Sequence, residues 1–426
     1  MDYDFGERAS KLRSRLREMI AAEIPAGYLG AFTDDPADLH IAQHFCRRLA
    51  EEGLLTVSWP EEYGGGGGSV WEQTVVREEM WSHHEPRGAQ YMGLNWVGPA
   101  IMAFGTDAQK QRFLPPIAAG EVIWCQGFSE PDAGSDLASL TTRAEPDGEG
   151  LRITGQKIWT SYAEMAQWCV LAARVGVPGA NGAKKHEGIT IFLVPMNREG
   201  ITVRPIRSML GPHHLNECFF DSVPVEADEV LGGVGQGWNV IRRALAHERV
   251  GIARYARCDR LMSQYTGKAD GWRALPAGLR QQWVRALVQI RVARLLAYRA
   301  VAEQEAGQPR DATASVARLA VTQCDQQVAE LLFQAIEDRS LEGSDTGVES
   351  KAAPNPAGSS TAAIPERPPF TDKPLSVKGG RQRSHAFLDG AIEDHWRYAQ
   401  AATVAAGTIE IQRMIVARAL LGTRSS

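Results

Sequence analysis

The spacing of hydrophobic residues changes twice along the chain, and each change predicts a domain boundary. Up to about residue 122, apolar residues recur every three or four positions, the period of an amphipathic helix. Short apolar runs bounded by Gly, Pro, Asp or Asn then predict strands up to about residue 232. Helical spacing returns after residue 237. The pattern predicts a multidomain α/β/α protein: an N-terminal helical domain (1–122), a small central β-barrel or sandwich (123–232) and a C-terminal four-helix-type bundle (233–426).

Individual elements follow from the same pattern. The predicted helices cover residues 11–22, 38–53, 71–83, 95–104, 109–117, 238–265, 278–305, 313–338 and 409–421. The clearest predicted strands cover residues 151–154, 168–173, 189–194, 201–203 and 217–220. Residues 176–187 predict an exposed hairpin loop. Between residues 340 and 385 the composition shifts to Gly, Ser, Pro, Lys and Arg, which predicts a loop or disordered insertion outside the packed core.

Composition excludes several classes of protein. The chain has 426 residues and a net charge of −5, so it offers no basic field for nucleic acid. It has six cysteines and no CxxC pair, which favours reduced thiols and argues against a zinc cluster. It contains no apolar run of the length that spans a membrane, and no signal-peptide pattern at its N-terminus. We therefore expect a cytoplasmic protein with no membrane partner.

Two turn-rich segments carry the chemistry of the predicted β-domain. Residues 124–136 read WCQGFSEPDAGSD, and residues 155–161 read GQKIWTS. Exposed backbone amides, hydroxyl groups and a flat aromatic side chain suit a planar ligand with a polar edge. A β-hairpin with a buried tryptophan is the alternative that the same residues allow.

A third unusual segment is the glycine run at residues 64–68. It follows the residues WPEEY and has no Lys-Ser or Lys-Thr after it and no strand before it. A phosphate-binding P-loop requires both features, so we interpret the run as a flexible turn.

Four blocks of residues give the chain a resemblance to the acyl-CoA dehydrogenase family. They are WPEEYGG at 59–65, FSEPDAGSD at 128–136, GQKIWTS at 155–161 and AGTIEIQR at 406–413. Their order and spacing are similar to the family's, and only residues 266–400 match loosely. The resemblance implies the α–β–α order, with FAD held between the β-domain and the bundle.

The resemblance also implies the roles of individual residues. Two groups match positions that contact the flavin ring, two residues match positions near the ribityl and pyrophosphate portion, and one matches a position near the acyl-CoA. These are, in that order, Gln126, Phe128 and Ser129 with Trp159, Thr160 and Ser161; then Thr408 and Glu410; then Ser135. Taken alone, Trp159 is also explained as an ordinary core aromatic. A cofactor ring needs a stacking surface and a few aimed hydrogen bonds, which these residue types supply.

The family reaction needs a carboxylate that removes the proton α to the thioester while hydride leaves the β carbon for flavin N5. The position that holds this base in many members is Ala406 here. A subset of the family carries the base in a Glu-Arg pair near the start of the first C-terminal helix, and this chain has Glu248 and Arg249 there. We therefore expect Glu248 to be the base and Arg249 to contact the substrate.

Helical spacing supports the assignment of Glu248. The residues three, four and seven positions away are mostly apolar: Leu245, Ala244, Ile241, Ile252 and Tyr255. A carboxylate on an apolar face is either paired or functional. A buried salt bridge to an arginine of a neighbouring helix is the alternative.

Two family elements are missing. The Arg-x-x-Phe-Gly element, whose arginine reaches FAD in a neighbouring subunit, is replaced by residues 267–274, and the Gln-x-x-Gly-Gly element has no counterpart at 340–385. Some bacterial members form mixed assemblies in which two different chains complete each site, and these act on bulky, steroid-type acyl-CoAs. Residues 211–221 also resemble that subgroup. We expect a homo-oligomer such as a tetramer, or a hetero-oligomer with a second acyl-CoA dehydrogenase-like chain, acting in fatty-acid or steroid degradation.

The resemblance thus predicts an FAD-dependent acyl-CoA dehydrogenase that uses an acyl-CoA substrate and an electron-transfer flavoprotein as acceptor. Two alternatives stay open at this point. A flavin-dependent oxidase or monooxygenase on the same fold needs no α-proton base. A partner subunit with an incomplete site of its own would contribute only part of the active centre.

Overall fold

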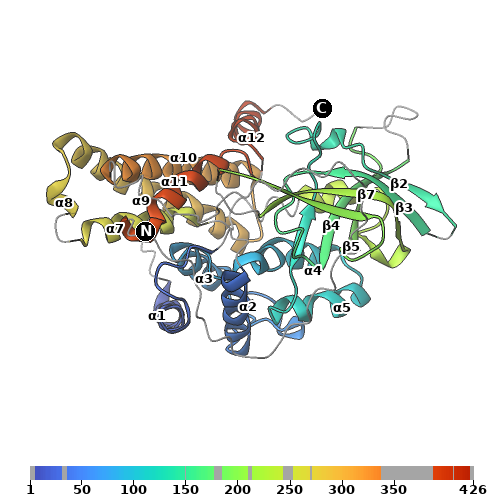
Figure 1. Cartoon of the computed structure of the whole chain (residues 1–426), viewed down its shortest axis with the longest axis horizontal. Helices are drawn as coiled ribbons and strands as arrows, with labels where there is room; N and C mark the ends of the chain where they lie inside the picture. Colours follow the sequence, from blue (N-terminus) through green and yellow to red (C-terminus); the bar gives the residue numbers. More distant parts are fainter. Residues whose placement is uncertain are drawn as a thin grey trace, which may run out of the picture.

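The computed structural model describes residues 5–30, 36–148, 150–176, 185–209, 214–242, 253–268, 271–336, 387–405 and 407–422. The predicted insertion at 340–385 and most of the predicted loop at 176–187 lie outside these residues. Helices come before and after a central set of strands (Figure 1), so the predicted α/β/α class is confirmed.

The N-terminal part is helical, as its apolar spacing predicted. Its α-helices are α1 (Gly6–Glu23), α2 (Pro36–Glu51), α3 (Val70–Ser82), α4 (Gly98–Phe104) and α5 (Asp107–Ala118). Two of them begin at capping boxes. The hydroxyl of Ser69 accepts from the amide of Glu72 at 3.2 Å, and the Glu72 carboxylate accepts from the amide of Ser69 at 2.8 Å. Thr106 and Gln109 repeat the arrangement at α5. Local side-chain chemistry therefore fixes where α3 and α5 start.

The glycine run at 64–68 folds back on the loop before it. The amides of Gly65, Gly66, Gly67 and Gly68 all donate to carbonyl oxygens of residues 56–60. Donors used in this way are not available to phosphate, which agrees with the exclusion of a P-loop. The sequence predicted a flexible turn here, but the backbone amides of residues 65–68 are all hydrogen-bonded to the preceding loop.

The central part is a β-domain whose eight strands belong to one hydrogen-bonded sheet. The strands are β1 (Trp124–Gly127), β2 (Arg143–Asp147), β3 (Gly150–Lys157), β4 (Trp168–Val175), β5 (Ile189–Pro195), β6 (Ile201–Ile206), β7 (Leu215–Val225) and β8 (Val230–Leu231). Their order is β6-β7-β3-β2-β4-β5-β8, and β1 pairs in parallel with β4. The ends of β1 and β3, where the two turn-rich segments lie, are joined by a backbone hydrogen bond between Ile158 and Ser129.

Strands β4 and β5 are buried on both faces, because alternate residues enter two different hydrophobic clusters. Val170 and Ala172 belong to the cluster that contains the N-terminal residue Phe113. Cys169 and Leu171 belong to the cluster that extends to Trp283 in the C-terminal part. A strand buried on both faces is a continuous apolar run, which is the pattern that residues 168–173 show.

The C-terminal part consists of α7 (Arg254–Thr266), α8 (Gly271–Ala274), α9 (Ala277–Glu305), α10 (Asp311–Ile336), α11 (Ala391–Ala401) and α12 (Ile409–Leu421). Helix α10 packs against α7, α9, α11 and α12 and is the centre of this bundle (Figure 1). The bounds of α12 match the prediction. The single helix predicted over 238–265 is wrong, because Ala253 has non-helical dihedral angles and α7 begins only at Arg254.

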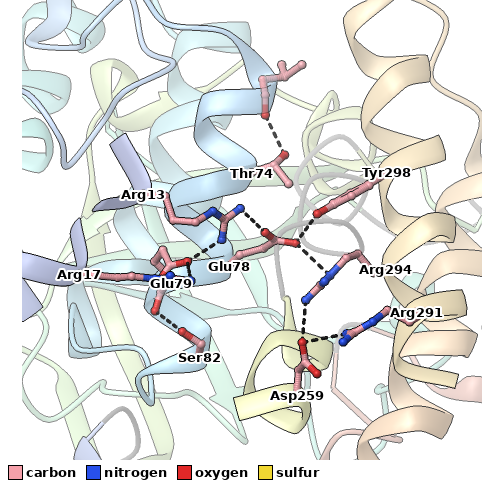
Figure 2. Close-up of polar contacts among 11 residues, drawn as sticks. Arg13, Arg17, Thr74, Glu78, Glu79, Ser82, Asp259, Arg291, Arg294 and Tyr298 are labelled. Atoms are coloured by element: carbon pink, nitrogen blue, oxygen red, sulfur yellow. Dashed lines mark hydrogen bonds and ion pairs between the residues drawn. The ribbon is translucent and has the colours of Figure 1, made fainter. Parts of the chain in front are cut away.

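A network of ion pairs joins the N-terminal helices to the bundle (Figure 2). Glu78 of α3 is paired with Arg13 of α1 at 2.8 Å and accepts a hydrogen bond from the hydroxyl of Tyr298 of α9 at 2.7 Å. Arg294 of α9 reaches Glu78 at 3.5 Å and Asp259 of α7 at 3.2 Å. Because Glu78 is buried, each of these partners offsets the cost of removing its charge from water. The network holds α1, α3, α7 and α9 in one arrangement.

Within the described residues, no helix has the length and apolar character needed to cross a membrane.

Candidate functional site

The two turn-rich segments meet at one edge of the sheet. The amide of Ile158, just after β3, donates to the carbonyl oxygen of Ser129, just after β1, at 2.9 Å. Gln126 and Ser129 are half-buried, and Phe128 lies in the core. The structure therefore brings together the residues at 126–129 and those at 159–161, which are about thirty positions apart in the sequence.

A buried ion pair locks this junction. Nζ of Lys157 lies 2.8 Å from Oε1 of Glu130 and donates to the carbonyl oxygen of Phe128 at 3.0 Å. Glu130 also accepts from the amides of Thr141 and Thr142, at 2.6 Å and 2.9 Å. Burial alone raises the pKa of the Glu130 carboxyl, but Lys157 and these hydrogen bonds outweigh it and lower the pKa to about 2. The carboxylate stays ionised and fixes the loop after β1 onto the end of β3.

Trp159 projects away from this junction. Its side chain is 57% exposed, and its φ of 60° lies in the left-handed region that residues other than glycine rarely adopt. The interpretation of Trp159 as a core aromatic is therefore wrong, as is a hairpin built around a buried tryptophan at this position. The buried tryptophan of the region is Trp124. A strained backbone that presents an indole to the surface is typical of a binding site.

The residues after Trp159 are held rigidly by the start of β7. The amide of Thr160 donates to the carbonyl oxygen of Asn216 at 2.9 Å, and Nδ2 of Asn216 donates back to the carbonyl oxygen of Thr160 at 3.1 Å. The amide of Tyr162 donates to the carbonyl oxygen of His214 at 2.6 Å. Thr160 is buried and Ser161 is half-buried. The exposed indole thus stands on a fixed base, and the residue before it is hydrogen-bonded to the backbone of Ser129.

Ser135 lies farther along the same loop and is exposed. Its neighbour Asp136 accepts from the hydroxyl of Ser139 at 2.6 Å and pairs with Lys185. These contacts shape the loop without covering the Ser135 hydroxyl.

Thr408 and Glu410 lie on α12, which packs against α10. The hydroxyl of Thr408 caps the helix by accepting from the amide of Ile411 at 3.3 Å, and the exposed Glu410 lies 4.0 Å from Arg413. The structure shows these residues at the start of a helix and gives them no polar contact with residues 126–129 or 159–161 in the described part of the chain.

Glu248 and Arg249 lie outside the described residues. Val240 and Ile241, on the N-terminal side, are buried, as are Ala253 and Tyr255 on the C-terminal side. The break at Ala253 removes Tyr255 from the helical face that was used to argue for Glu248. Leu245, Ala244 and Ile241 precede that break in the sequence, on the same side of it as Glu248.

Sequence reasoning missed the residues that build the junction: Lys157, Glu130 and Asn216. Lys157 and Glu130 lie inside the two blocks that were singled out, so their opposite charges offered a signal. Asn216 offered none, because its role depends on the register in which β7 pairs with β3.

Comparison with known proteins was decisive for the family. Three family models match in order: the acyl-CoA dehydrogenase N-terminal domain at residues 6–121, the middle domain at 125–223 and the C-terminal domain at 235–351. Acyl-CoA dehydrogenase FadE26 of Mycobacterium tuberculosis is 32% identical over 354 residues, which are 79% of this chain and 86% of the relative. The chain belongs to the acyl-CoA dehydrogenase family.

Other relatives show greater identity over shorter stretches. Acyl-CoA dehydrogenase IpdE1 of Mycobacterium tuberculosis is 39% identical over 247 residues, 58% of this chain and 63% of that relative. IpdE1 of Mycolicibacterium smegmatis is 40% identical over 213 residues, 48% of this chain and 53% of that relative. The chain thus spans less than two thirds of the length of these two relatives.

Solved structures agree with the fold over the whole chain. The structure described as the Tcur3481-Tcur3483 steroid ACAD has a TM-score of 0.81 and 29% identity, with all of both chains covered. The ChsE4-ChsE5 complex from Mycobacterium tuberculosis has a TM-score of 0.78 and 26% identity, again with both chains fully covered. Both names describe assemblies of two different chains.

Proposed function

We propose that this protein is an FAD-dependent acyl-CoA dehydrogenase that introduces an α,β double bond into an acyl-CoA thioester. Membership of the family supports a dehydrogenase. The observation that carries the finer proposal is the junction at the end of β1 and β3, where Trp159 is exposed on a rigid base and the preceding residue is hydrogen-bonded to the backbone of Ser129. An aromatic surface with a few polar groups at its edge fits a flavin ring.

The residues present fit this cofactor. Trp159 offers the stacking surface, and Gln126, Ser129 and Ser161 offer partly exposed polar groups. Bound FAD supplies the hydride acceptor of the reaction. Thr408 and Glu410 belong to the proposed site only through their match to the family, and a neighbouring subunit is one source of such residues.

We infer that Glu248 removes the α proton, with Arg249 beside it contacting the substrate. The support is the position of this Glu-Arg pair in the sequence and the alanine at residue 406, the other base position of the family. A carboxylate in this role is most effective when partial desolvation raises its pKa towards the working pH.

We also infer that the substrate is a bulky, steroid-type acyl-CoA and that a second acyl-CoA dehydrogenase-like chain completes the assembly. The name of the Tcur3481-Tcur3483 steroid ACAD supports both points, and the name of the ChsE4-ChsE5 complex supports the second. The surface of α9 supports the second, because it exposes apolar residues at helical spacing: Val284, Val288, Val292 and Leu295. An unpartnered apolar stripe of this kind marks a protein interface. The electron acceptor we infer from family membership is an electron-transfer flavoprotein.

The test is anaerobic reduction of the bound flavin. The FAD-loaded protein, purified alone and with a co-produced partner chain, is mixed with a steroid-type acyl-CoA and its visible absorption is recorded. We expect bleaching by the wild type and loss of bleaching at an unchanged FAD content for Glu248→Gln. The exposed Glu164, near the junction, supplies the control variant Glu164→Gln, which should bleach normally.

The outcomes separate the alternatives. A protein that is colourless alone and yellow only with its partner supports the mixed assembly. Bleaching by Glu248→Gln at the wild-type rate contradicts the proposed base and favours an oxidase or monooxygenase. Failure of every acyl-CoA to bleach bound flavin contradicts the dehydrogenase.

A further inference from the structure

The bundle contains a buried charged cluster that no part of the proposed reaction uses. Arg254 and Arg257 of α7 are both fully buried and share one carboxylate, Asp325 of α10, at 3.7 Å and 3.4 Å. His395 of α11 lies 3.7 Å from the same carboxylate. Burial lowers the pKa of His395 to about 3, with Arg257 adding to the effect, so this histidine is neutral. Two guanidinium groups therefore face one carboxylate.

The arginines have hydrogen-bonding capacity to spare. Nη2 of Arg254 donates to the hydroxyl of Tyr398 at 2.9 Å. Nε and Nη1 of Arg254 and Nε of Arg257 are buried and donate no hydrogen bond in the part of the chain that the structure describes. Buried donors of this kind are costly unless a partner is supplied, and a guanidinium matches a carboxylate in shape and charge. Among the described residues, the cluster carries one more positive charge than negative charge.

A metal ion does not fit here, although three suitable ligands converge. Ligand atoms of Cys258, Asp325 and His395 all lie within 4.8 Å of one another. Arg254 and Arg257 flank the same aspartate, and their positive charges repel a cation. Burial also raises the pKa of the Cys258 thiol well above its usual value, which disfavours the thiolate that a metal needs. The surplus charge of the cluster favours an anion.

A run of aromatic rings connects the cluster to the proposed flavin site. Tyr162, three residues after Trp159, lies with its ring centroid 6.4 Å from that of Tyr91. The ring of Tyr91 lies 6.3 Å from that of Trp81, and Cζ of Arg254 lies 6.0 Å from the Trp81 ring. Three consecutive ring contacts thus lead from the flavin wall to the arginines. These contacts place the arginines on the side of the bundle that faces the β-domain residue Tyr162.

The sequence places the proposed base close to the same cluster. Arg254 is six positions after Glu248, so the two α-carbons are at most about 20 Å apart even in an extended chain.

We propose that Arg254 and Arg257 bind a carboxylate carried at the far end of the acyl group, opposite the thioester. The inference rests on the proposed function and specifies its substrate class as an acyl-CoA with a distal acid group. Asp325 and Tyr398 position the guanidinium groups, and the surplus positive charge selects against acyl groups with an uncharged end.

The experiment compares two CoA thioesters on the assembled, FAD-loaded protein: cyclohexylpropanoyl-CoA and the analogue that carries a carboxylate on the far side of its ring. We expect kcat/KM for the carboxylated thioester to be higher by about tenfold or more, the size expected for a charge-assisted hydrogen bond. Arg254→Gln and Arg257→Gln should each remove most of this preference through KM. Arg291→Gln is the matched control, because Arg291 lies on the exposed face of α9 and pairs with Asp259. It should leave the preference unchanged.

Three results would overturn the inference. Equal use of both thioesters, or preference for the uncharged one, contradicts the anion site and leaves the dehydrogenase intact. A preference that survives both glutamine variants places the site elsewhere. Failure of both thioesters to bleach a flavin that a steroid-type acyl-CoA does bleach contradicts the inference alone, and failure of every acyl-CoA contradicts the proposed function with it. The comparison of the two thioesters on the wild-type protein does not depend on the folding of any variant. If either glutamine variant fails to fold, Arg254→Lys replaces it, and we expect this variant to retain part of the preference because it keeps the positive charge.

Discussion

The ion pair between Lys157 and Glu130 offers the sharpest test of how the candidate site is built. Lys157→Met removes the ammonium group and keeps most of the apolar side chain. It leaves the Glu130 carboxylate buried, since that side chain is only 4% exposed and Lys157 is fully buried. Breaking a buried pair by removing one partner costs about 3–5 kcal/mol. We expect the free energy of unfolding to fall by that amount at neutral pH.

The pH dependence gives a second measure of how strongly the whole junction, including the hydrogen bonds from Thr141 and Thr142, stabilises the ionised Glu130. The pKa of Glu130 falls from its ordinary value of 4.5 to about 2, because Lys157 and the hydrogen bonds outweigh burial. A carboxyl group whose pKa is lower in the folded state than in the unfolded state stabilises the fold at pH values above its unfolded pKa. This stabilisation is lost as the pH falls through the pKa of the folded state. At about 1.4 kcal/mol per unit, the contribution is about 3 kcal/mol at neutral pH and about half of that near pH 3. The difference between wild type and Lys157→Met should therefore narrow as the pH falls below about 4.

The assay is urea unfolding of the FAD-loaded protein followed by tryptophan fluorescence, at neutral pH and at pH values down to about 3. Lys11→Met is the control, because Lys11 is exposed and forms a surface pair with Glu7 at 2.7 Å. Surface pairs contribute at most about 1 kcal/mol. The double variant Glu130→Gln with Lys157→Met should be more stable than Lys157→Met alone, because no buried charge remains. If Lys157→Met costs no more than Lys11→Met, the junction does not depend on this pair and the reasoning fails.

Three further predictions follow from the site and its surroundings. Trp159→Ala should weaken FAD binding by about tenfold, measured by titration with FAD, and should leave the melting temperature unchanged because the indole is exposed. The control Trp272→Ala removes another exposed indole and should change neither the affinity for FAD nor the melting temperature. Val288→Asp puts a charge in the middle of the exposed apolar stripe of α9 and should shift the sedimentation-velocity profile towards smaller assemblies. An unchanged profile would show that the subunit interface does not include this stripe. Tyr298→Phe removes the hydrogen bond to Glu78 and should lower the free energy of unfolding by about 2 kcal/mol in urea titration; a loss below about 0.5 kcal/mol would show that the arginines suffice.

Much of the fold was readable from the sequence because burial imposes a period. Helices such as α12 and strands such as β4 repeat their apolar residues at the spacing of their own backbone, so type and bounds follow from local residues. The predicted helix over 238–265 failed for the same reason. The spacing of apolar residues indicates which residues face the core. It does not indicate a change of backbone dihedral angles at a single residue, which here occurs at Ala253.

Some features of the candidate site could be predicted from the sequence, and others became visible only in the tertiary structure. Sequence alone determined the family, and it supplied the two blocks of the proposed flavin wall and the proposed Glu-Arg pair at residues 248 and 249, because these depend on residue types in a fixed order. Only the tertiary structure showed that Trp159 is exposed, that Lys157 neutralises Glu130, and that Arg254 and Arg257 share one carboxylate. Each of these depends on segments far apart in the chain. Their meeting is set by strand register and helix packing, which the residues of any single segment do not encode.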